Sequence, residues 1–425
     1  MRDPAPELSA PLEELDRELA GLLRAELARE RATLNLIASE NFVPRALLEV
    51  QGSVLTNKYA DGYPGAREYD GCEVVDEVER LAIARACALF GAEHANVQPY
   101  SGASANFAVL RALAAPGDTV LGWDFTHGGH PTHYDRDTLT GVLYRGVTYH
   151  VRRDDRLVDL DEVAALARAE RPRVIFVGWC LYTRHLDYRA FREIADEVGA
   201  VLVADMAHVS GLVAAGMYPS PVGIADVCTF TTHKTVGGGR GGTILCRQEL
   251  AGRIDAAVYP GSQGGPLPHV IGAHALAFGL ARRPAFRERM ARTLSGARVL
   301  AGVLADHATE TRCDVVTGGT ETHQVVLDTS PRGVGASTAL EDLHAVGVNA
   351  NALPLAFDPV PGPTGSGLRL GTAALATRGF ADAEFAELGE ILAGALGPAR
   401  GARHAELAGR AEALRAGFPL YPGLG

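Results

Sequence analysis

Hydrophobic and polar positions divide the chain into an N-terminal helical stretch, a central alternation of helices and strands, and a C-terminal part dominated by long helices. Residues 12–31 carry leucines at helical spacing among Glu and Arg, which predicts an amphipathic helix. Residues 35–71 are rich in Gly, Asn, Tyr and Pro, so we predict mostly loop and an extended arm there.

The central part has the rhythm of an α/β fold. A helix is predicted over residues 75–91, and strands that are apolar on both faces are predicted at TVLGW, VIFVGW, AVLVAD and DVCTFTT. Such strands, joined by helices, are typical of a mostly parallel sheet whose ligands gather at the carboxyl ends of the strands. After about residue 290, long helices surround THQVVLDTS, which predicts a smaller α+β domain. We predict an N-terminal helix and arm over 1–72, a large domain over 73–290 and a small domain over 291–425.

Composition narrows the class of protein. The 425 residues are 47% hydrophobic and 21% charged, as in a large globular protein, and the net charge of −11 argues against a general nucleic-acid binder. Six cysteines lack CxxC pairing, and the start MRDPAPELSA lacks the basic and apolar regions of a signal peptide, so we predict a cytoplasmic protein. No apolar stretch is long enough to predict a membrane span.

Only two of the 40 basic residues are lysines, Lys58 and Lys234, which points to amine chemistry that arginine cannot perform. One strand runs into Asp205 and His208, and a later strand runs into Lys234. A pyridoxal phosphate cofactor needs a lysine for the Schiff base, a carboxylate at the pyridine nitrogen, and donors for the 3′-oxygen and the phosphate. The alternative for Asp205 is a helix N-cap after a strand.

Two glycine-containing turns lie near these strands. Ser101, Gly102 and Ala103 open a predicted helix, where free N–H groups favour an anion, so we assign the cofactor phosphate there. An ordinary capped helix is the alternative. The run 237–242 formally contains GxGxxG, but it lacks the following helix and acidic residue of a dinucleotide fold, and we interpret it as a loop beside the lysine.

Two more side chains are candidates. His130, in HGGHPTH, is predicted to stack on the pyridine ring, with a hydrogen-bonded loop histidine as the alternative; no HExxH helix or set of ligand spacing supports a metal there. Arg369, in GSGLRLGT, lies in a strand-like segment and suits bidentate binding of a substrate carboxylate, with a surface strand arginine as the alternative.

Seven segments, taken in order, resemble the serine hydroxymethyltransferase family over about residues 10–395. They are LNLIASENFVPRALLEVQGSVLTNKYADGYPGAREYDGCEVVDEVE, VQPYSGASAN, HGGHPTH, REIADEVGAVLVADMAHVSGLVAAG, TFTTHKTVGGGRGG, YPGSQGGP and SGLRLGTAALATRG. The resemblance implies a fold-type I pyridoxal-phosphate transferase and an obligate homodimer with active sites at the subunit interface. It also implies a small amino acid as substrate, with an aldehyde or folate as co-substrate.

The resemblance assigns roles to individual residues. Lys234 becomes the Schiff-base lysine, Asp205 the partner of the pyridine nitrogen, and His130 the stacking residue. Further cofactor contacts are implied for Ser101, Gly102, Ala103, Cys180, His208 and His233, and from the partner subunit for Tyr59 and Gly265. Ser39, Tyr59, Asp61, Tyr69 and Arg369 are implied around the amino-acid substrate.

The sequence also departs from the family pattern. Asp61 stands where the family has a glutamate that handles protons at the β-hydroxyl and the folate, and Cys180 replaces a serine that donates toward the 3′-oxygen. Tyr100 replaces a histidine, Gly237 and Gly239 replace an arginine and a proline, and the loop after Asn351 is two residues longer. These changes spare the cofactor and carboxylate positions but touch the folate side and the β-carbon.

We therefore favour a specialised aldol-type transfer, for example a threonine transaldolase that releases acetaldehyde and joins the glycyl unit to another aldehyde. The alternative is an ordinary tetrahydrofolate-dependent serine hydroxymethyltransferase, so the use of tetrahydrofolate stays open. An aminotransferase, a racemase or a non-catalytic homologue fits the motif set less well.

Overall fold

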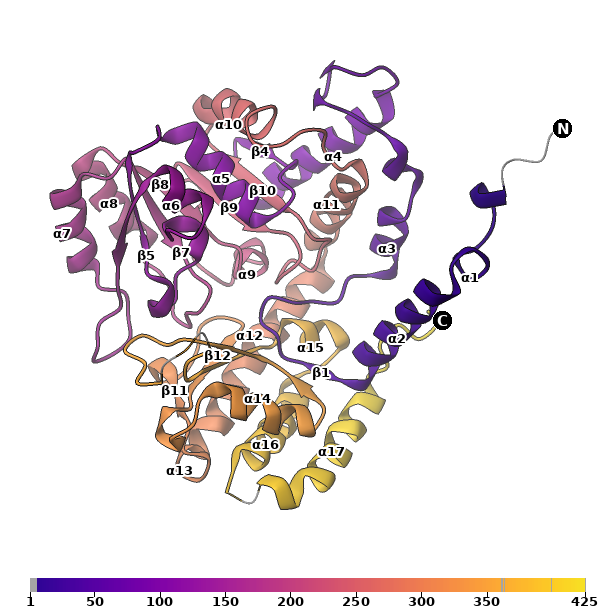
Figure 1. Ribbon diagram of the computed structural model, residues 1–425, viewed down its shortest axis with the longest axis vertical. Coiled ribbons are helices and arrows are strands. Elements are labelled where there is room, and N and C mark those ends of the chain that lie inside the picture. Colours follow the sequence, from indigo (N-terminus) through magenta and orange to yellow (C-terminus); the bar gives the residue numbers. More distant parts are fainter. Residues whose placement is uncertain (1–5, 361, 363, 399, 425) are drawn as a thin grey trace.

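The computed structural model describes residues 6–360, 362, 364–398 and 400–424, and a seven-stranded sheet forms its centre (Figure 1). In order across the sheet, the strands are β4 (His94–Asn96), β10 (Gly242–Cys246), β9 (Val227–Thr231), β8 (Val201–Asp205), β7 (Val174–Gly178), β5 (Thr119–Trp123) and β6 (Arg145–Tyr149). The five strands from β9 to β6 are parallel, whereas β10 pairs antiparallel with β9 and β4. The predicted α/β fold with a mostly parallel sheet is confirmed.

Helices cover both faces of this sheet, which explains why its strands are apolar throughout. In β7, Ile175 and Val177 belong to one core and Val174 and Phe176 to the other, because successive side chains point to opposite faces. The first core is closed by α4 (Glu73–Phe90), α7 (Leu160–Glu170), α8 (Tyr188–Val198) and α11 (Pro268–Ala281), the second by α5 (Gly102–Leu113) and α10 (Ala251–Val258). Polar groups therefore collect at the ends of the strands.

A second, four-stranded antiparallel sheet forms a smaller α+β unit below the first in Figure 1. Its strands, in order, are β11 (Asp314–Val315), β12 (Gln324–Asp328), β15 (Gly367–Gly371) and β14 (Asn351–Leu353). Its helices are α12 (Pro284–Asp306), α14 (Ala336–Ala345), α16 (Asp382–Leu396) and α17 (Arg400–Gly417). Helix α12 runs without a break through residue 290, so the predicted domain boundary there stays a prediction.

The N-terminal region differs from the prediction in two ways. The helix expected over 12–31 is divided into α1 (Leu12–Leu15) and α2 (Arg17–Ala32), because Asp16 leaves the helical conformation and its side chain accepts a hydrogen bond from the N–H of Leu19. The arm, expected to be mostly loop, contains α3 (Arg45–Gln51) and the hairpin β2 (Gly62–Tyr63) and β3 (Ala66–Arg67).

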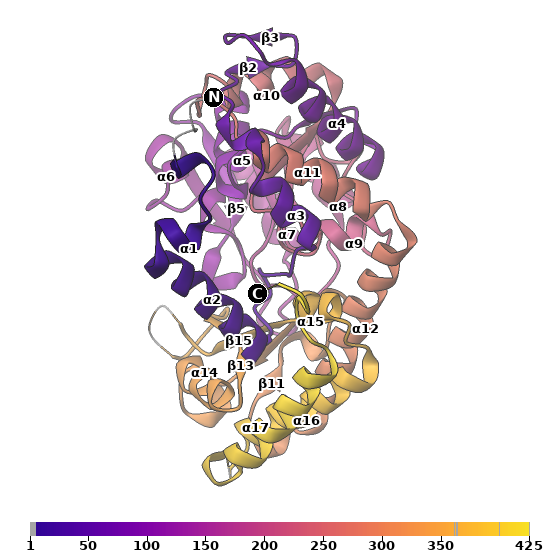
Figure 2. The same cartoon turned by 90° about the vertical axis from the view of Figure 1, so that its right-hand side faces the viewer.

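The leucine stripe of α2 is not buried within the chain. Leu22 is 62% exposed and Leu23 56% exposed, although both follow the spacing of an amphipathic helix. Figure 2 shows α1, α2, α3, α4 and α11 on the same side of the molecule. This side of the molecule therefore carries exposed apolar residues.

The remaining α-helices and β-strands are short. They are α6 (Leu139–Leu143), α9 (Ser210–Ala214), α13 (Ala308–Thr311), α15 (Ala373–Arg378), and the parallel pair β1 (Leu34–Asn35) and β13 (Val348–Asn349), which ties the N-terminal arm to the smaller unit. All six cysteines are free. Within the described residues, none of the helices combines the length and the apolar character needed to cross a membrane.

Candidate active site

Lys234 lies three residues after β9, at the carboxyl edge of the large sheet, and is buried. Burial lowers the pKa of its ammonium group, because the charged form loses its hydration, so more of the lysine is present as the nucleophilic amine. The side-chain amide of Asn41 donates to the Lys234 carbonyl over 2.8 Å and fixes the backbone there. The other lysine, Lys58, instead donates to the carbonyl of Asp70.

Asp205 is the last residue of β8 and is held by three donors. Its Oδ2 accepts hydrogen bonds from Asn106 Nδ2 at 2.9 Å and His133 Nε2 at 3.1 Å, and its Oδ1 accepts one from the N–H of Ala207 at 3.0 Å. Burial alone would raise the pKa of Asp205, but these donors outweigh it and hold the pKa below its usual value. The helix-cap alternative is wrong, because α9 begins at Ser210 with Val209 as its N-cap residue.

The histidine that contacts Asp205 is His133, which the sequence interpretation passed over. Its ring is stacked on Phe176 with 4.6 Å between centroids and an angle of 7°. His130, the predicted stacking residue, lies beside it at 5.6 Å, and its Nδ1 is 2.7 Å from Oγ1 of Thr132. Burial lowers the pKa of His130 to about 3, so its ring is neutral at physiological pH. Stacking of His130 on a cofactor ring stays a prediction.

His208 is oriented by Gln324, another residue that the sequence interpretation missed. The amide Nε2 of Gln324 contacts Nδ1 of His208 at 2.9 Å and donates to the carbonyl of Cys180 at 3.0 Å. Burial keeps the pKa of His208 well below its ordinary value, so its ring is neutral. An amide nitrogen can only donate, so Nδ1 accepts and the single ring proton lies on Nε2. His208 therefore presents a fixed N–H donor.

Arg369 lies in β15 and is buried. Its Nε donates to Oδ1 of Asn351 at 3.0 Å, and its Nη1 donates to the carbonyl of Cys180 at 2.6 Å. Within the described part of the chain, no hydrogen bond occupies its Nη2. The surface-arginine alternative is wrong, and the held guanidinium leaves one nitrogen for an anionic ligand.

Ser39, the predicted neighbour of the substrate, follows a residue that packs against the Arg369 strand. The carbonyl of Ala38 accepts a hydrogen bond from Nε2 of His323 at 3.0 Å, and Ala38 lies directly against Gly371 of β15. The structure thus brings Ser39 to the end of the strand that carries Arg369.

The predicted phosphate site lies where α5 begins. The first N–H groups of this helix, those of Gly102 and Ala103, have no helical carbonyl to bind, while Ser101 and Ser104 form a capping box. Two buried polar atoms that have no partner among the described residues, Oγ1 of Thr231 and Nδ1 of His233, lie on the segment that leads to Lys234. A methyl group of Thr231 lies against Gly102. These donors fit a phosphate.

The arm residues form a separate group. The rings of Tyr59 and Tyr69 are in edge contact with 4.9 Å between centroids. A Cβ atom on Gly265 would lie 2.7 Å from Oδ1 of Asp61 and 3.2 Å from Cζ of Tyr59, so the glycine leaves room for both side chains. Over the described ranges, no hydrogen bond, ion pair or ring contact joins these four residues to Lys234.

His127, the other histidine of HGGHPTH, contacts the rings of His150 and Phe357 at 4.6 and 4.8 Å. In the part of the chain that the structure describes, no group of three or more His, Cys, Asp and Glu residues is placed to hold a metal ion.

The carboxyl edge of a mostly parallel sheet carries an amine, an ionised carboxylate and a neutral imidazole, and a guanidinium from a smaller α+β unit lies beside them. This combination defines a fold-type I pyridoxal-phosphate enzyme. The family model for serine hydroxymethyltransferase matches residues 12–392. Serine hydroxymethyltransferase of Nocardia farcinica is 55% identical over 415 residues, covering 97% of this chain and 96% of the relative. Serine hydroxymethyltransferase 1 of Mycobacterium tuberculosis is 53% identical over 418 residues, covering 98% and 95%. The chain belongs to the serine hydroxymethyltransferase family and is a pyridoxal-phosphate-dependent transferase.

Proposed function

We propose that the protein is a tetrahydrofolate-dependent serine hydroxymethyltransferase, which moves the hydroxymethyl carbon of L-serine to the folate and leaves glycine. The observation that carries the proposal is that Gln324, which contacts His208, and Arg369 both donate to the Cys180 carbonyl, so one backbone group links the imidazole to the guanidinium. Relatives that bear this enzyme's name align over nearly the whole chain, which supports it further. This function was the alternative in the sequence interpretation, and we now rank it above the specialised transfer.

Each side chain then has a defined task. Bound pyridoxal phosphate supplies an electron sink for the pair left on Cα when the Cα–Cβ bond breaks. Lys234 would attach the cofactor, and the ionised Asp205 would keep the pyridine nitrogen protonated. Arg369 would bind the substrate carboxylate through Nη2 and so set which bond of Cα is perpendicular to the ring. Asp61 would accept and return the proton of the β-hydroxyl group.

A homodimer with shared active sites, which the family resemblance implies, would bring the arm of one chain to the site of the other. The exposed leucines of α2 and the exposed ring of Tyr59 are the kind of apolar surface that a subunit interface covers. Co-expression of Lys234→Ala and Asp61→Asn chains tests this arrangement. Random pairing should restore about a quarter of the wild-type sites, because each mixed dimer of the closed type regains one intact site. Activity no higher than that of either variant alone would contradict shared sites.

The specialised transfer remains a second candidate, because Asp61 is one methylene shorter than the glutamate expected there. A displacement of about 1 Å can cost about a hundredfold in rate. An enzyme that no longer needs the folate could tolerate such a change.

The cytoplasmic location of the protein also stays a prediction.

The deciding experiment gives the purified holoenzyme L-serine and tetrahydrofolate and measures glycine, with Lys234→Ala as the inactive control. We expect glycine formation that depends on the folate. If glycine forms only slowly and without folate dependence, while acetaldehyde release from L-threonine accelerates with an added aldehyde, the transaldolase would be the function instead.

A further inference from the structure

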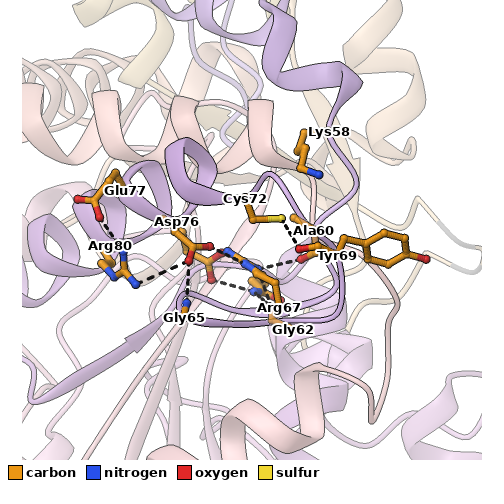
Figure 3. Close-up of polar contacts among 12 residues, drawn as sticks. Lys58, Ala60, Gly62, Gly65, Arg67, Tyr69, Cys72, Asp76, Glu77 and Arg80 are labelled. Carbon is orange, nitrogen blue, oxygen red and sulfur yellow. Dashed lines mark hydrogen bonds and ion pairs between the residues drawn. The ribbon is translucent and has the colours of Figure 1, made fainter.

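The side chain of Arg67, on strand β3 of the arm, is almost completely buried beside Asp76 of α4 (Figure 3). Glu79 of the same helix is its second carboxylate partner. The Arg67 side chain is 4% exposed, and those of Asp76 and Glu79 are 10% and 2% exposed. Arg67 Nε donates to Oδ1 of Asp76 at 2.8 Å, and Nη2 donates to Oε2 of Glu79 at 2.6 Å. Buried charges of this kind require close pairing, so the geometry of the guanidinium is strictly fixed.

The remaining terminal nitrogen of Arg67 binds the arm backbone on both sides of Asp61. Nη1 donates to the carbonyl of Ala60 at 2.8 Å and to that of Gly62 at 2.6 Å. A second donor, Nε2 of Gln98, reaches the same Gly62 carbonyl at 3.0 Å. The Ala60–Asp61 and Gly62–Tyr63 peptide units, on either side of Asp61, are therefore both tied to one rigid, planar group.

The carboxylates that hold Arg67 are themselves tied to their surroundings. Asp76 Oδ2 also accepts the N–H of Gly65 at 2.7 Å, and Glu79 Oε1 accepts Nε2 of Gln98 at 2.8 Å. The hydrogen bonds of the hairpin turn thus lead directly to α4, one of the helices packed on the central sheet. We call the set Arg67, Asp76, Glu79 and Gln98 the arm clamp.

The side chain that the arm clamp locates is free to act. Oδ1 of Asp61 is buried and has no hydrogen-bond partner among the described residues. A single-methylene side chain cannot reach as far as glutamate, so the position of its carboxylate depends mainly on its backbone.

We propose that Arg67 is a positioning residue of the reaction: through the carbonyls of Ala60 and Gly62 it sets where the Asp61 carboxylate lies in the active site. The proposal rests on the proposed role of Asp61 in proton transfer. It assigns to Arg67 no contact with substrate or cofactor.

A double-mutant cycle tests the arm clamp. We compare the wild type, Arg67→Lys, Asp61→Asn and the double variant, measuring kcat and KM for L-serine per cofactor-loaded site. Lysine keeps the charge but lacks the planar fork, so Arg67→Lys should lower kcat about 10- to 100-fold, as expected for a misplaced reacting group. In the Asp61→Asn background the same change should lower kcat less than twofold, since the residue that it positions is already inactive.

The matched control is Arg80→Lys. Arg80 contacts the same Asp76 at 3.7 Å and also pairs with Glu77, but its side chain is 48% exposed. Among the described residues of the arm, it bonds no carbonyl. It should leave kcat within twofold of wild type. If Arg67→Lys does not fold, Gln98→Met takes its place in the cycle. It removes the second donor to Gly62 and the bond to Glu79 but leaves Arg67 in place, so we expect a smaller loss in the same direction.

Equal losses of kcat in both backgrounds would overturn the proposal, as would an unchanged kcat in Arg67→Lys. A purely structural role would lower the melting temperature and the yield of holoenzyme but not kcat per loaded site. If the wild type forms no glycine from L-serine with tetrahydrofolate, the proposed function fails on its own, and the same cycle is measured on cleavage of L-threonine. An Asp61→Asn enzyme as active as wild type would refute the role of Asp61 and the positioning role with it.

Discussion

Replacing Gln324 by glutamate should invert the hydrogen bond that orients His208. In the wild type the Gln324 amide is fixed in one orientation, because its Oε1 accepts the N–H of Tyr182 at 3.3 Å while its Nε2 binds His208 and the Cys180 carbonyl. An ionised glutamate can only accept hydrogen bonds. Nδ1 of His208 would then have to carry a proton, and the neutral ring would lose the proton on Nε2.

The magnitude follows from the bonds that change. Leaving one buried hydrogen-bonding group unsatisfied costs about 1–3 kcal/mol, which corresponds to about a 5- to 150-fold decrease in kcat/KM. The decrease should be smaller at low pH, because a protonated glutamic acid can donate to Nδ1 again. The ratio of wild-type to Gln324→Glu activity, measured with L-serine and tetrahydrofolate, should therefore fall as the pH decreases.

Gln324→Met provides the control, since it removes the same hydrogen bonds without adding an acid. Its activity should be reduced by a factor that does not vary with pH. If the Gln324→Glu enzyme has a kcat/KM within twofold of wild type, or if its activity ratio is constant across the pH range, the assignment of the His208 tautomer is refuted.

Two further predictions concern the substrate clamp and acid stability. Arg369→Lys should raise the KM for L-serine by about 10- to 150-fold, because a charged hydrogen bond contributes about 1.5–3 kcal/mol. The control is Arg332→Lys, at an arginine of the same unit whose side chain is buried and pairs with Asp342. In steady-state kinetics, a KM for Arg369→Lys equal to that of the wild type would contradict the prediction. Burial lowers the pKa of His323 to about 3, so below pH 6.5 the unfolded chain binds a proton that the folded chain does not, and stability is lost as the pH falls toward 3. His323→Asn should make the fall of the unfolding free energy with decreasing pH shallower by up to about 1.4 kcal/mol per pH unit. Urea unfolding of the holoenzyme at constant protein concentration measures this free energy at each pH. Equal slopes for the variant and the wild type would contradict the prediction.

The parallel part of the sheet could be predicted because its strands are short, apolar on both faces and separated by helices. The antiparallel edge could not be predicted, because no feature of the sequence of β10 itself indicates the direction in which it pairs with β9 and β4. The break between α1 and α2 was also missed, because the leucine spacing continues through Asp16 and only its capping contact separates the two helices.

For the site, the sequence pointed to residues with distinctive chemistry in or just after a strand, but not to the residues that orient them. Lys234, Asp205 and Arg369 stand out by type and position. Gln324 begins strand β12 and is followed by three apolar residues, and its partners are more than a hundred residues away. No local sequence pattern therefore indicates its role. A signal did exist for Asn106, a buried polar residue on the apolar face of a predicted helix.

The departures from the family pattern gain a different meaning from these contacts. Cys180 anchors Gln324 and Arg369 through its backbone carbonyl, and any residue at that position has such a carbonyl. Tyr100, in place of a histidine, donates its hydroxyl proton to the Gly265 carbonyl at 2.7 Å and so stays connected to the arm.

Asp61 is held through the carbonyls of its neighbours, and Asn351, at the lengthened loop, binds Nε of Arg369. At each of these positions a backbone group, or a side chain still present, makes the contact on which the site depends. Substitutions that had favoured a changed reaction can therefore be accommodated by a scaffold that keeps the original one. Asp61 is the exception, because its carboxylate itself is shorter, so activity with tetrahydrofolate depends on how the arm clamp places that one group.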